Sequence, residues 1–365
     1  MAGINKCKEA MTAKERVLKT FHLEKTDRVT IGYNGNVNIN QALIKELHAK
    51  DYNDMLDMLG VDYRGVMPSY KGPEIFRQLP GRRTDPIEGC RMRWVEHQTG
   101  GYWDFCDFPL QGASDDEIAA FPIPDPDDFD IQSAYDYLQS LNGKYAVYIG
   151  HEGVPDVINS NGRIMGMEEV LVHLALENEA ALDFFKRRAE MYLRIMERTL
   201  DKCRGMVDFM WLGEDLGTQR APMISLEMYR RTLKPLHKMF VDLAKAYDIP
   251  TIIHTCGSSS WAYEDMMEIG IKGVDTLQPE ALNMSPQYLK EHFGGRLCFR
   301  GCISTAGPLA YGTAEQTREY CKNTLEIMMQ GYGYHFAPTH YIQDNSPVEN
   351  VIAMYQAAHD FGVYR

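Results

Sequence analysis

Two residues near the middle of the sequence, His254 and Cys256, have the side chains and the spacing of a metal site. They end the run Thr251-Ile-Ile-His-Thr-Cys-Gly257. In an extended segment, side chains two residues apart point to the same side, so the imidazole nitrogen and the thiolate sulfur can converge on one ion. Zinc prefers such ligands in a tetrahedral arrangement. The simpler alternative is a buried cysteine beside a hydrogen-bonded histidine, because so short a motif also arises by chance.

Polar residues that could do chemistry also follow other short apolar runs. They are Tyr33, Asn34, His151, Glu152, Glu214, Asp215, Gln278, Glu280, Arg300, Cys302 and His340. If the runs are parallel strands of one barrel, these residues gather at the carboxyl ends of the strands, where the active sites of such barrels lie. The pattern therefore predicts a site rich in metal-binding groups at that end.

The apolar runs themselves have the length of strands. They span 29–33, 61–67, 145–150, 206–213, 249–254, 273–277, 296–300 and 333–337. Helical patterns lie between most of them, at 168–203, 226–247, 261–269, 285–293, 314–330 and 347–361. This alternation predicts a single (β/α)8 TIM barrel over residues 1–365. An open doubly wound sheet is disfavoured, because no glycine-rich dinucleotide motif follows the first strand.

Some local signals refine this plan. Residues 1–27 are expected to form an N-terminal helical arm, which begins at a capping box from Thr12 to Glu15. Residues 90–110 predict a β-hairpin insertion with its turn at Thr99-Gly-Gly101, and residues 125–130 an acidic loop. Ser346 is expected to cap the last helix, with Pro347 in its first turn. No repeat or linker indicates a second domain.

The composition excludes several classes of function. The net charge of −13 argues against a nucleic-acid partner, which would need a basic surface. No apolar stretch approaches the length of a membrane span, and the polar N-terminus does not resemble a signal peptide. Eight scattered cysteines suit a reducing compartment. We therefore expect a soluble, cytoplasmic protein.

Three motifs resemble the uroporphyrinogen decarboxylase superfamily over nearly the full length of the chain. They are Trp211-Leu-Gly-Glu-Asp-Leu-Gly217 with the downstream Pro222, Ser225, Tyr229 and Pro235; His254-Thr-Cys-Gly257; and the segment 337–350. Within the superfamily the chain resembles cobamide-dependent methyltransferases, which hold zinc with a His-x-Cys pair and a C-terminal cysteine. His340 stands where that cysteine would be, so either the metal is lost or histidine replaces cysteine as the ligand, and we favour the second because histidine is among the commonest metal ligands. The resemblance thus implies catalytic zinc ligands at His254, Cys256 and His340, with Glu214 as a fourth ligand or a neighbour.

Two other functions stay open at this point. In the decarboxylase branch, the stretch after the first strand carries arginines that suit a polycarboxylated tetrapyrrole. Here the same stretch, 32–40, has none, although Arg64 or Arg300 could compensate from elsewhere. A barrel that binds a metal or a partner without catalysis is the third possibility.

The ligand set bears on the direction of methyl transfer. A site with one thiolate makes zinc a harder Lewis acid than a site with two, which suits an oxygen leaving group. We therefore expect an O-demethylase that moves a methyl group from a small methoxylated, aromatic compound to cob(I)alamin. A separate corrinoid protein would supply the cobalamin, because the sequence has no cobalamin-binding signature. Methylation of a thiol by methylcobalamin is the alternative. Candidate substrate-binding residues, chosen by their position near strand ends, are Tyr33, Trp211, Met223, Phe336 and Tyr341.

Overall fold

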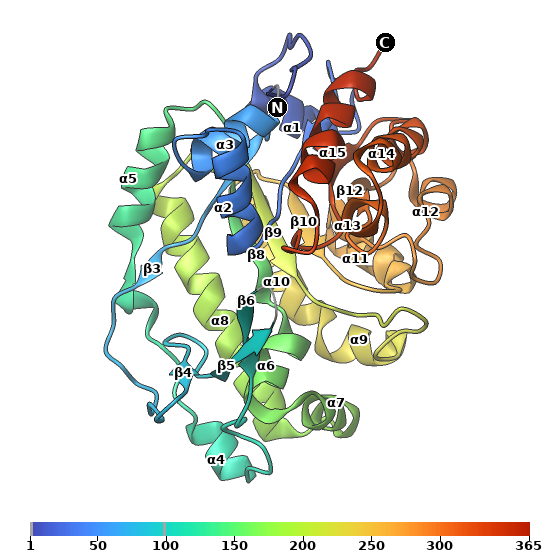
Figure 1. Cartoon of the computed structure of the whole chain (residues 1–365). Helices are drawn as coiled ribbons and strands as arrows, with labels where there is room; N and C mark the ends of the chain where they lie inside the picture. Colours follow the sequence, from blue (N-terminus) through green and yellow to red (C-terminus); the bar gives the residue numbers. More distant parts are fainter. Residues whose placement is uncertain (1–2, 98–99) are drawn as a thin grey trace.

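A computed structural model of the chain describes residues 3–97 and 100–365. At its centre is a parallel sheet of eight strands in the order β1-β13-β12-β11-β10-β9-β8-β2 (Figure 1). The strands are β1 (Thr30–Ile31), β2 (Tyr63–Val66), β8 (Ala146–Pro155), β9 (Phe209–Gly213), β10 (Thr251–His254), β11 (Gly273–Leu277), β12 (Cys298–Ile303) and β13 (Tyr334–Pro338). Each expected strand is confirmed, and β8 continues past its expected end at Gly150 to Pro155.

The sheet curls until its two edge strands, β1 and β2, meet at Asp62. The backbone N–H of Asp62 donates to the carbonyl of Ile31 at 3.0 Å. The Asp62 carboxylate in turn accepts from the N–H of Ile31 at 2.7 Å. Two buried arginines bind the same carboxylate, Arg16 at 2.6 Å and Arg28 at 2.7 Å. A charged hydrogen-bond cluster therefore joins the first strand to the second.

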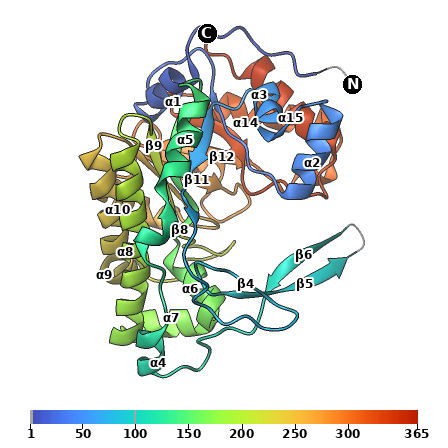
Figure 2. The same ribbon diagram turned by 90° about the vertical axis from the view of Figure 1, so that its left-hand side faces the viewer.

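Helices follow the strands and pack around the curled sheet (Figures 1 and 2). They are α2 (Val37–Glu46), α3 (Tyr52–Leu59), α5 (Ile131–Leu141), α6 (Val157–Met165), α7 (Met167–Leu176), α8 (Glu179–Lys202), α9 (Leu226–Thr232), α10 (Lys234–Ala246), α11 (Tyr263–Ile269), α12 (Pro286–Phe293), α13 (Pro308–Tyr311), α14 (Ala314–Met328) and α15 (Val348–Phe361). A 3-10 turn, η2 (Ser260–Ala262), leads into α11. None of the described helices combines the length and the apolar character that crossing a membrane requires.

Three details of the helices differ from the expectation. The pattern over 168–203 forms two helices, because Glu177 has a positive φ of 50° and Asn178 caps the next helix through its side chain. The pattern over 226–247 is also divided, with Pro235 in the first turn of α10, where its missing N–H costs least. Ser346 is not the cap of α15: Pro347 takes that position, and the Ser346 hydroxyl is buried with no hydrogen-bond partner among the described residues.

The N-terminal arm closes one end of the curled sheet. Its helix α1 (Ala13–Phe21) begins at the predicted capping box of Thr12 and Glu15. Phe21 packs against Phe209 and His335, with ring centroids 5.2 and 5.0 Å away. A small core inside the sheet joins α1 to residues at the starts of the strands, among them Tyr63 and Phe209. Because α1 covers the amino ends of the strands, access to the interior is from their carboxyl ends.

An insertion between β2 and α5 carries the predicted hairpin. Its short elements are β3 (Ser69–Tyr70), β4 (Arg83–Thr84), β5 (Arg91–His97), β6 (Gly100–Phe105), α4 (Asp115–Ala120), η1 (Pro126–Asp128) and β7 (Phe129–Asp130). Strands β5 and β6 pair antiparallel and confirm the hairpin, whereas Thr99 of its predicted turn lies outside the described residues. Figure 2 shows the hairpin projecting away from the main sheet. The acidic loop contributes η1 and β7, and β7 pairs with β3.

The Asp62 cluster yields a stability prediction. Asp62→Asn should lower the free energy of unfolding by about 1.5–3 kcal/mol, because it removes the carboxylate that Arg16 and Arg28 share while Arg16 keeps Asp27 and Arg28 keeps Glu9. Asp183→Asn is the matched control, since Asp183 pairs with Arg187 on an exposed helix face and should cost less than about 1 kcal/mol. Urea unfolding followed by circular dichroism measures both. Equal effects of the two substitutions would contradict the role given to Asp62.

Candidate metal centre

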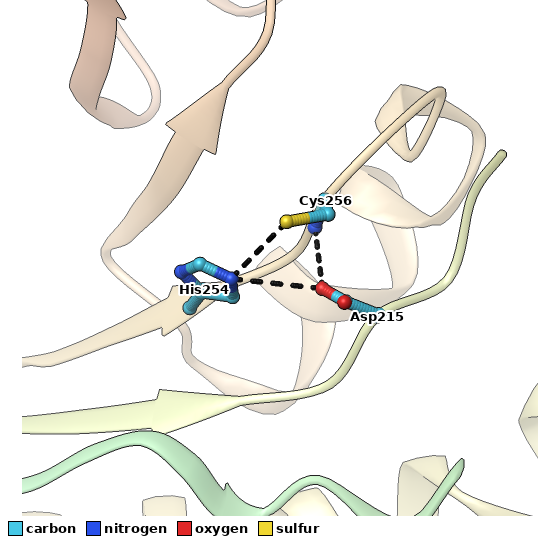
Figure 3. Close-up of side chains that lie close together, drawn as sticks. All are labelled: Asp215, His254 and Cys256. Atoms are coloured by element: carbon cyan, nitrogen blue, oxygen red, sulfur yellow. Dashed lines mark hydrogen bonds and ion pairs between the residues drawn. The ribbon is translucent and has the colours of Figure 1, made fainter. Parts of the chain in front are cut away.

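The structure brings His254 and Cys256 together at the carboxyl end of β10 (Figure 3). The Cys256 sulfur lies 3.3 Å from Nε2 of His254. His254 is the last residue of the strand, and Cys256 follows two positions later, so their side chains share one side of the extended backbone. The convergence that the spacing predicts is therefore present, and both side chains are only partly buried.

Asp215, which follows the neighbouring strand β9, completes a group of three (Figure 3). Its Oδ1 lies 3.6 Å from Nε2 of His254 and accepts a 2.8 Å hydrogen bond from the backbone N–H of Cys256. One nitrogen, one sulfur and one oxygen atom of these residues lie within 4.8 Å of one another. Imidazole, thiolate and carboxylate are the three ligand types that zinc takes in proteins, so the donor set fits that ion.

Glu214, the neighbour of Asp215, points elsewhere. Its fully buried carboxylate accepts the N–H groups of Val157 and Ile158, both at 2.9 Å, at the start of α6. It also lies 3.2 Å from Nε2 of the buried His237. Side chains alternate along an extended chain, so Glu214 holds the scaffold while Asp215 faces the site. Sequence analysis placed both after the strand and selected Glu214; the structure brings Asp215 to the His254–Cys256 pair.

A charged chain behind His254 sets the orientation of its ring. Nδ1 of His254 lies 3.1 Å from the carboxylate of Asp275 and 2.6 Å from the hydroxyl of Thr276. The other oxygen of Asp275 accepts a 2.5 Å hydrogen bond from Arg300. A proton on Nδ1 can be shared with Asp275, and in that tautomer Nε2 presents its lone pair to Cys256 and Asp215. Histidine ligands of metals are held by a carboxylate in this way.

The electrostatics of the group favour a cation. Burial alone would lower the pKa of His254, but the nearby Cys256 and Asp275 raise it well above its ordinary value. Burial would raise the pKa of Asp275, yet Arg300 and His254 bring it down to about 2. The pKa of Asp215 is also lowered despite burial, through His254 and the amide of Cys256. Burial raises the pKa of the Cys256 thiol. Two carboxylates of lowered pKa thus face a single imidazole, and a bound metal ion would be attracted by them and would favour the thiolate.

Two irregular strands shape this end of the sheet. The pairing of β11 with β12 shifts register between Val274 and Leu277, which places Asp275 and Thr276 at the irregularity behind His254. The pairing of β8 with β9 shifts between Gly150 and Pro155, so the intervening residues bulge. Bulges redirect side chains next to functional sites.

The group of three opens into a cavity of about 320 Å³, which we call the metal cavity. His340 lies in its wall, so all three residues of the expected zinc site border one space. His340 is exposed, and its Nδ1 is 3.4 Å from the carbonyl of Tyr341. It is not a member of the close group of His254, Cys256 and Asp215.

The five expected substrate-binding residues lie in different places. Tyr341 is in the wall of this cavity, and its hydroxyl donates to Glu152 at 2.6 Å. Tyr33 is in the wall of an adjoining cavity. Neither wall includes the other three: Trp211 and Phe336 are buried in the core, and Met223 packs against it.

Helix α6 contributes a polar face that sequence analysis missed. Asp156, Asn159 and Arg163 all lie in the cavity wall, at the spacing of one helix face. Asn159 donates to Asp215 at 2.8 Å and so ties the helix to the group of three. The sequence 157–165 contains Gly162 and several residues with weak helix preference, which hid the helix. The available signal was Asp156, whose side chain caps it.

Comparisons with known proteins agree with this architecture. The chain is similar to a solved structure described as a methyltransferase from Methanosarcina mazei, with 15% sequence identity and a TM-score of 0.66; the match covers 96% of this chain and 99% of that one. A comparison with curated protein sequences finds no match. The sequence profile for uroporphyrinogen decarboxylase (URO-D) matches residues 166–361, more than half of the chain and the part that carries Asp215, His254, Cys256 and His340. The chain therefore belongs to the uroporphyrinogen decarboxylase family.

Proposed function

We propose that this protein is a zinc-dependent O-demethylase, which transfers a methyl group from a small methoxylated arene to the cob(I)alamin of a separate corrinoid protein. The observation that carries the proposal is the convergence of Asp215, His254 and Cys256 at the open end of the sheet. The similar methyltransferase structure supports the reaction class. We further propose that residues 1–365 form one closed (β/α)8 domain of the cytoplasm, where the free thiols of its eight cysteines would persist.

The proposed zinc ligands are His254, Cys256 and Asp215, with His340 reaching them across the cavity as the fourth. One thiolate, one carboxylate and two neutral imidazoles balance the charge of Zn²⁺. Glu214 then supports the site by holding α6 rather than binding the ion. Bound zinc would act as a Lewis acid that makes an ether oxygen a better leaving group.

The protein's own groups orient this chemistry. Asp275 keeps the proton of His254 on Nδ1, so that Nε2 stays available as a ligand. Asn159 holds the second oxygen of Asp215. Because α1 covers the amino ends of the strands, the corrinoid partner is proposed to dock over their carboxyl ends, where the metal cavity opens.

The arginines near the site argue against a porphyrinogen substrate. Arg300 is fully engaged with Asp275, Tyr63 and Asn34, and Arg64 with Asp57 and Asn53. Arg163 is the one arginine in the described wall of the metal cavity. A polycarboxylated tetrapyrrole needs several cationic clamps, so a methyl donor of low charge fits this site better.

The metal site is tested first by elemental analysis of protein purified without chelator. The wild-type chain should carry one zinc ion. His254→Ala and Cys256→Ala should each weaken zinc binding by at least the roughly 10- to 100-fold that is typical even for lost outer-shell partners. Asp215→Asn and His340→Ala should weaken it as well, because each removes a proposed ligand.

His151→Ala serves as the matched control for these variants. His151 borders the same cavity but lies outside the close group, so its loss should leave the zinc content unchanged. A wild-type chain without stoichiometric metal would overturn the zinc proposal. If His340→Ala still carried one zinc ion per chain, the proposed ligands would be restricted to His254, Cys256 and Asp215.

The reaction is tested by supplying the corrinoid protein in two states. With cob(I)alamin and a panel of methoxyarenes, the absorption spectrum should change to that of methylcobalamin, and Cys256→Ala should abolish the change because it removes a zinc ligand. With methylcobalamin and thiols, no demethylation is expected. Loss of methylcobalamin only in the thiol assay would make the protein a thiol methyltransferase. Turnover without any corrinoid would contradict both directions.

A further inference from the structure

Six tyrosines surround a second cavity, of about 340 Å³, beside the metal cavity. They come from segments far apart in the sequence: Tyr33 after β1, Tyr52 in α3, Tyr63 in β2, Tyr137 in α5, Tyr148 in β8 and Tyr341 after β13. We call this space the tyrosine cavity. A space of this size, lined by ring faces with polar groups between them, can hold a small organic ligand.

The tyrosine cavity adjoins the metal cavity. His151, Glu152 and Tyr341 belong to the walls of both. Two of these residues, His151 and Glu152, lie in the bulge of β8, and the hydrogen bond from Tyr341 to Glu152 links the bulge to the loop after β13. The two cavities therefore meet at these three residues.

The hydroxyl groups of the six tyrosines fall into two sets. Tyr33 donates to Asn40, Tyr341 donates to Glu152, and Tyr63 accepts from Arg300. The hydroxyls of this first set are therefore already hydrogen-bonded within the protein.

The other set consists of Tyr52, Tyr137 and Tyr148, whose hydroxyls make no hydrogen bond with any residue that the structure describes. Tyr137 and Tyr148 are only partly exposed, so their rings belong to the wall and their hydroxyls are free to bind a ligand. Hydroxyl groups that are not already paired within the protein can donate to or accept from oxygen atoms on a ligand.

The charges in the wall favour a neutral ligand. Arg64 is buried and its guanidinium is neutralised by Asp57 at 2.8 Å. The Glu152 carboxylate is held by Tyr341. Rings of tyrosine can also bind an ammonium group through their faces, which makes an aryl ammonium the competing ligand. Among the described lining residues this leaves His151, whose Nδ1 accepts a 3.0 Å hydrogen bond from the backbone N–H of Gly153.

We propose that the tyrosine cavity binds the ring of a neutral oxygenated arene, a phenol or its methyl ether, with the methoxy group directed toward the metal cavity. The inference rests on the proposed function, which it deepens by locating the ring and by specifying its charge. Tyr137 and Tyr148 determine specificity: their faces contact the ring, and their hydroxyls bind its oxygen substituents.

The test is calorimetric binding of 2-methoxyphenol to the wild-type chain without any corrinoid protein. Tyr137→Leu and Tyr148→Leu should each weaken binding about 2- to 12-fold, the loss expected for one aromatic contact. Tyr148→Phe keeps the ring, so it should weaken binding of 2-methoxyphenol but leave toluene binding unchanged. Tyr311→Leu is the control, because Tyr311 is 76% exposed and lies outside the lining.

Several results would overturn the inference. One is no binding of 2-methoxyphenol to the wild-type chain; another is equal weakening by Tyr311→Leu. Tighter binding of trimethylphenylammonium would identify a cation site instead. Because the assay involves no methyl transfer, binding of the arene without turnover would count against the proposed function alone. Methyl transfer from a non-aromatic donor, without arene binding, would count against this inference alone.

Discussion

The carboxylate of Asp62 joins the two edges of the sheet and, through Arg16, the helix that covers one of its ends. Breaking a buried ion pair leaves a charge without compensation, so such a cluster permits few alternative arrangements. All eight strands are parallel, so their carboxyl ends lie at the same end of the curled sheet. With the amino ends covered by α1, the interior of the sheet offers chemistry at one end only, where the metal and tyrosine cavities both lie.

A second set of buried charges connects the scaffold to the site. Arg300 contacts Asn34, Tyr63 and Asp275, and Asp275 holds His254. The same arginine therefore contacts Asn34 in the loop after β1, Tyr63 in the wall of the tyrosine cavity, and Asp275, which holds His254. Its guanidinium also lies over the ring of Trp211, 4.3 Å from the ring centroid. Trp211 was predicted to contact the substrate, but the structure places it beneath the site and not in the wall of either cavity.

Sequence reasoning found the strands and the end of the sheet that carries the site. Short apolar runs followed by polar residues were sufficient, because parallel strands bring their last residues to one edge. The same rule placed Asn34, His151 and His340 near the His254–Cys256 pair, and all three border the metal cavity. It led to the selection of Glu214 instead of Asp215, because adjacent residues point to opposite sides and which of them faces the site depends on how the strand ends. The bulges in β8 and β11 leave no clear sequence signal, so the roles of Glu152 and Asp275 became visible only in three dimensions.

In the proposed reaction, the two cavities would divide chemistry and recognition between different parts of the chain. The metal group comes from β9 and β10, inside the segment 166–361 that defines the family. Of the six tyrosines, all but Tyr341 lie before residue 166, in the part of the chain that the family profile does not match. Residues that polarise a bond tolerate little change in geometry, whereas a wall of ring faces can be rebuilt to suit another ligand. On the proposed function, the tyrosine walls could therefore differ with the methyl donor while the metal group stays the same. The residues proposed to bind the ring, rather than the proposed zinc ligands, would then set which donor this chain accepts.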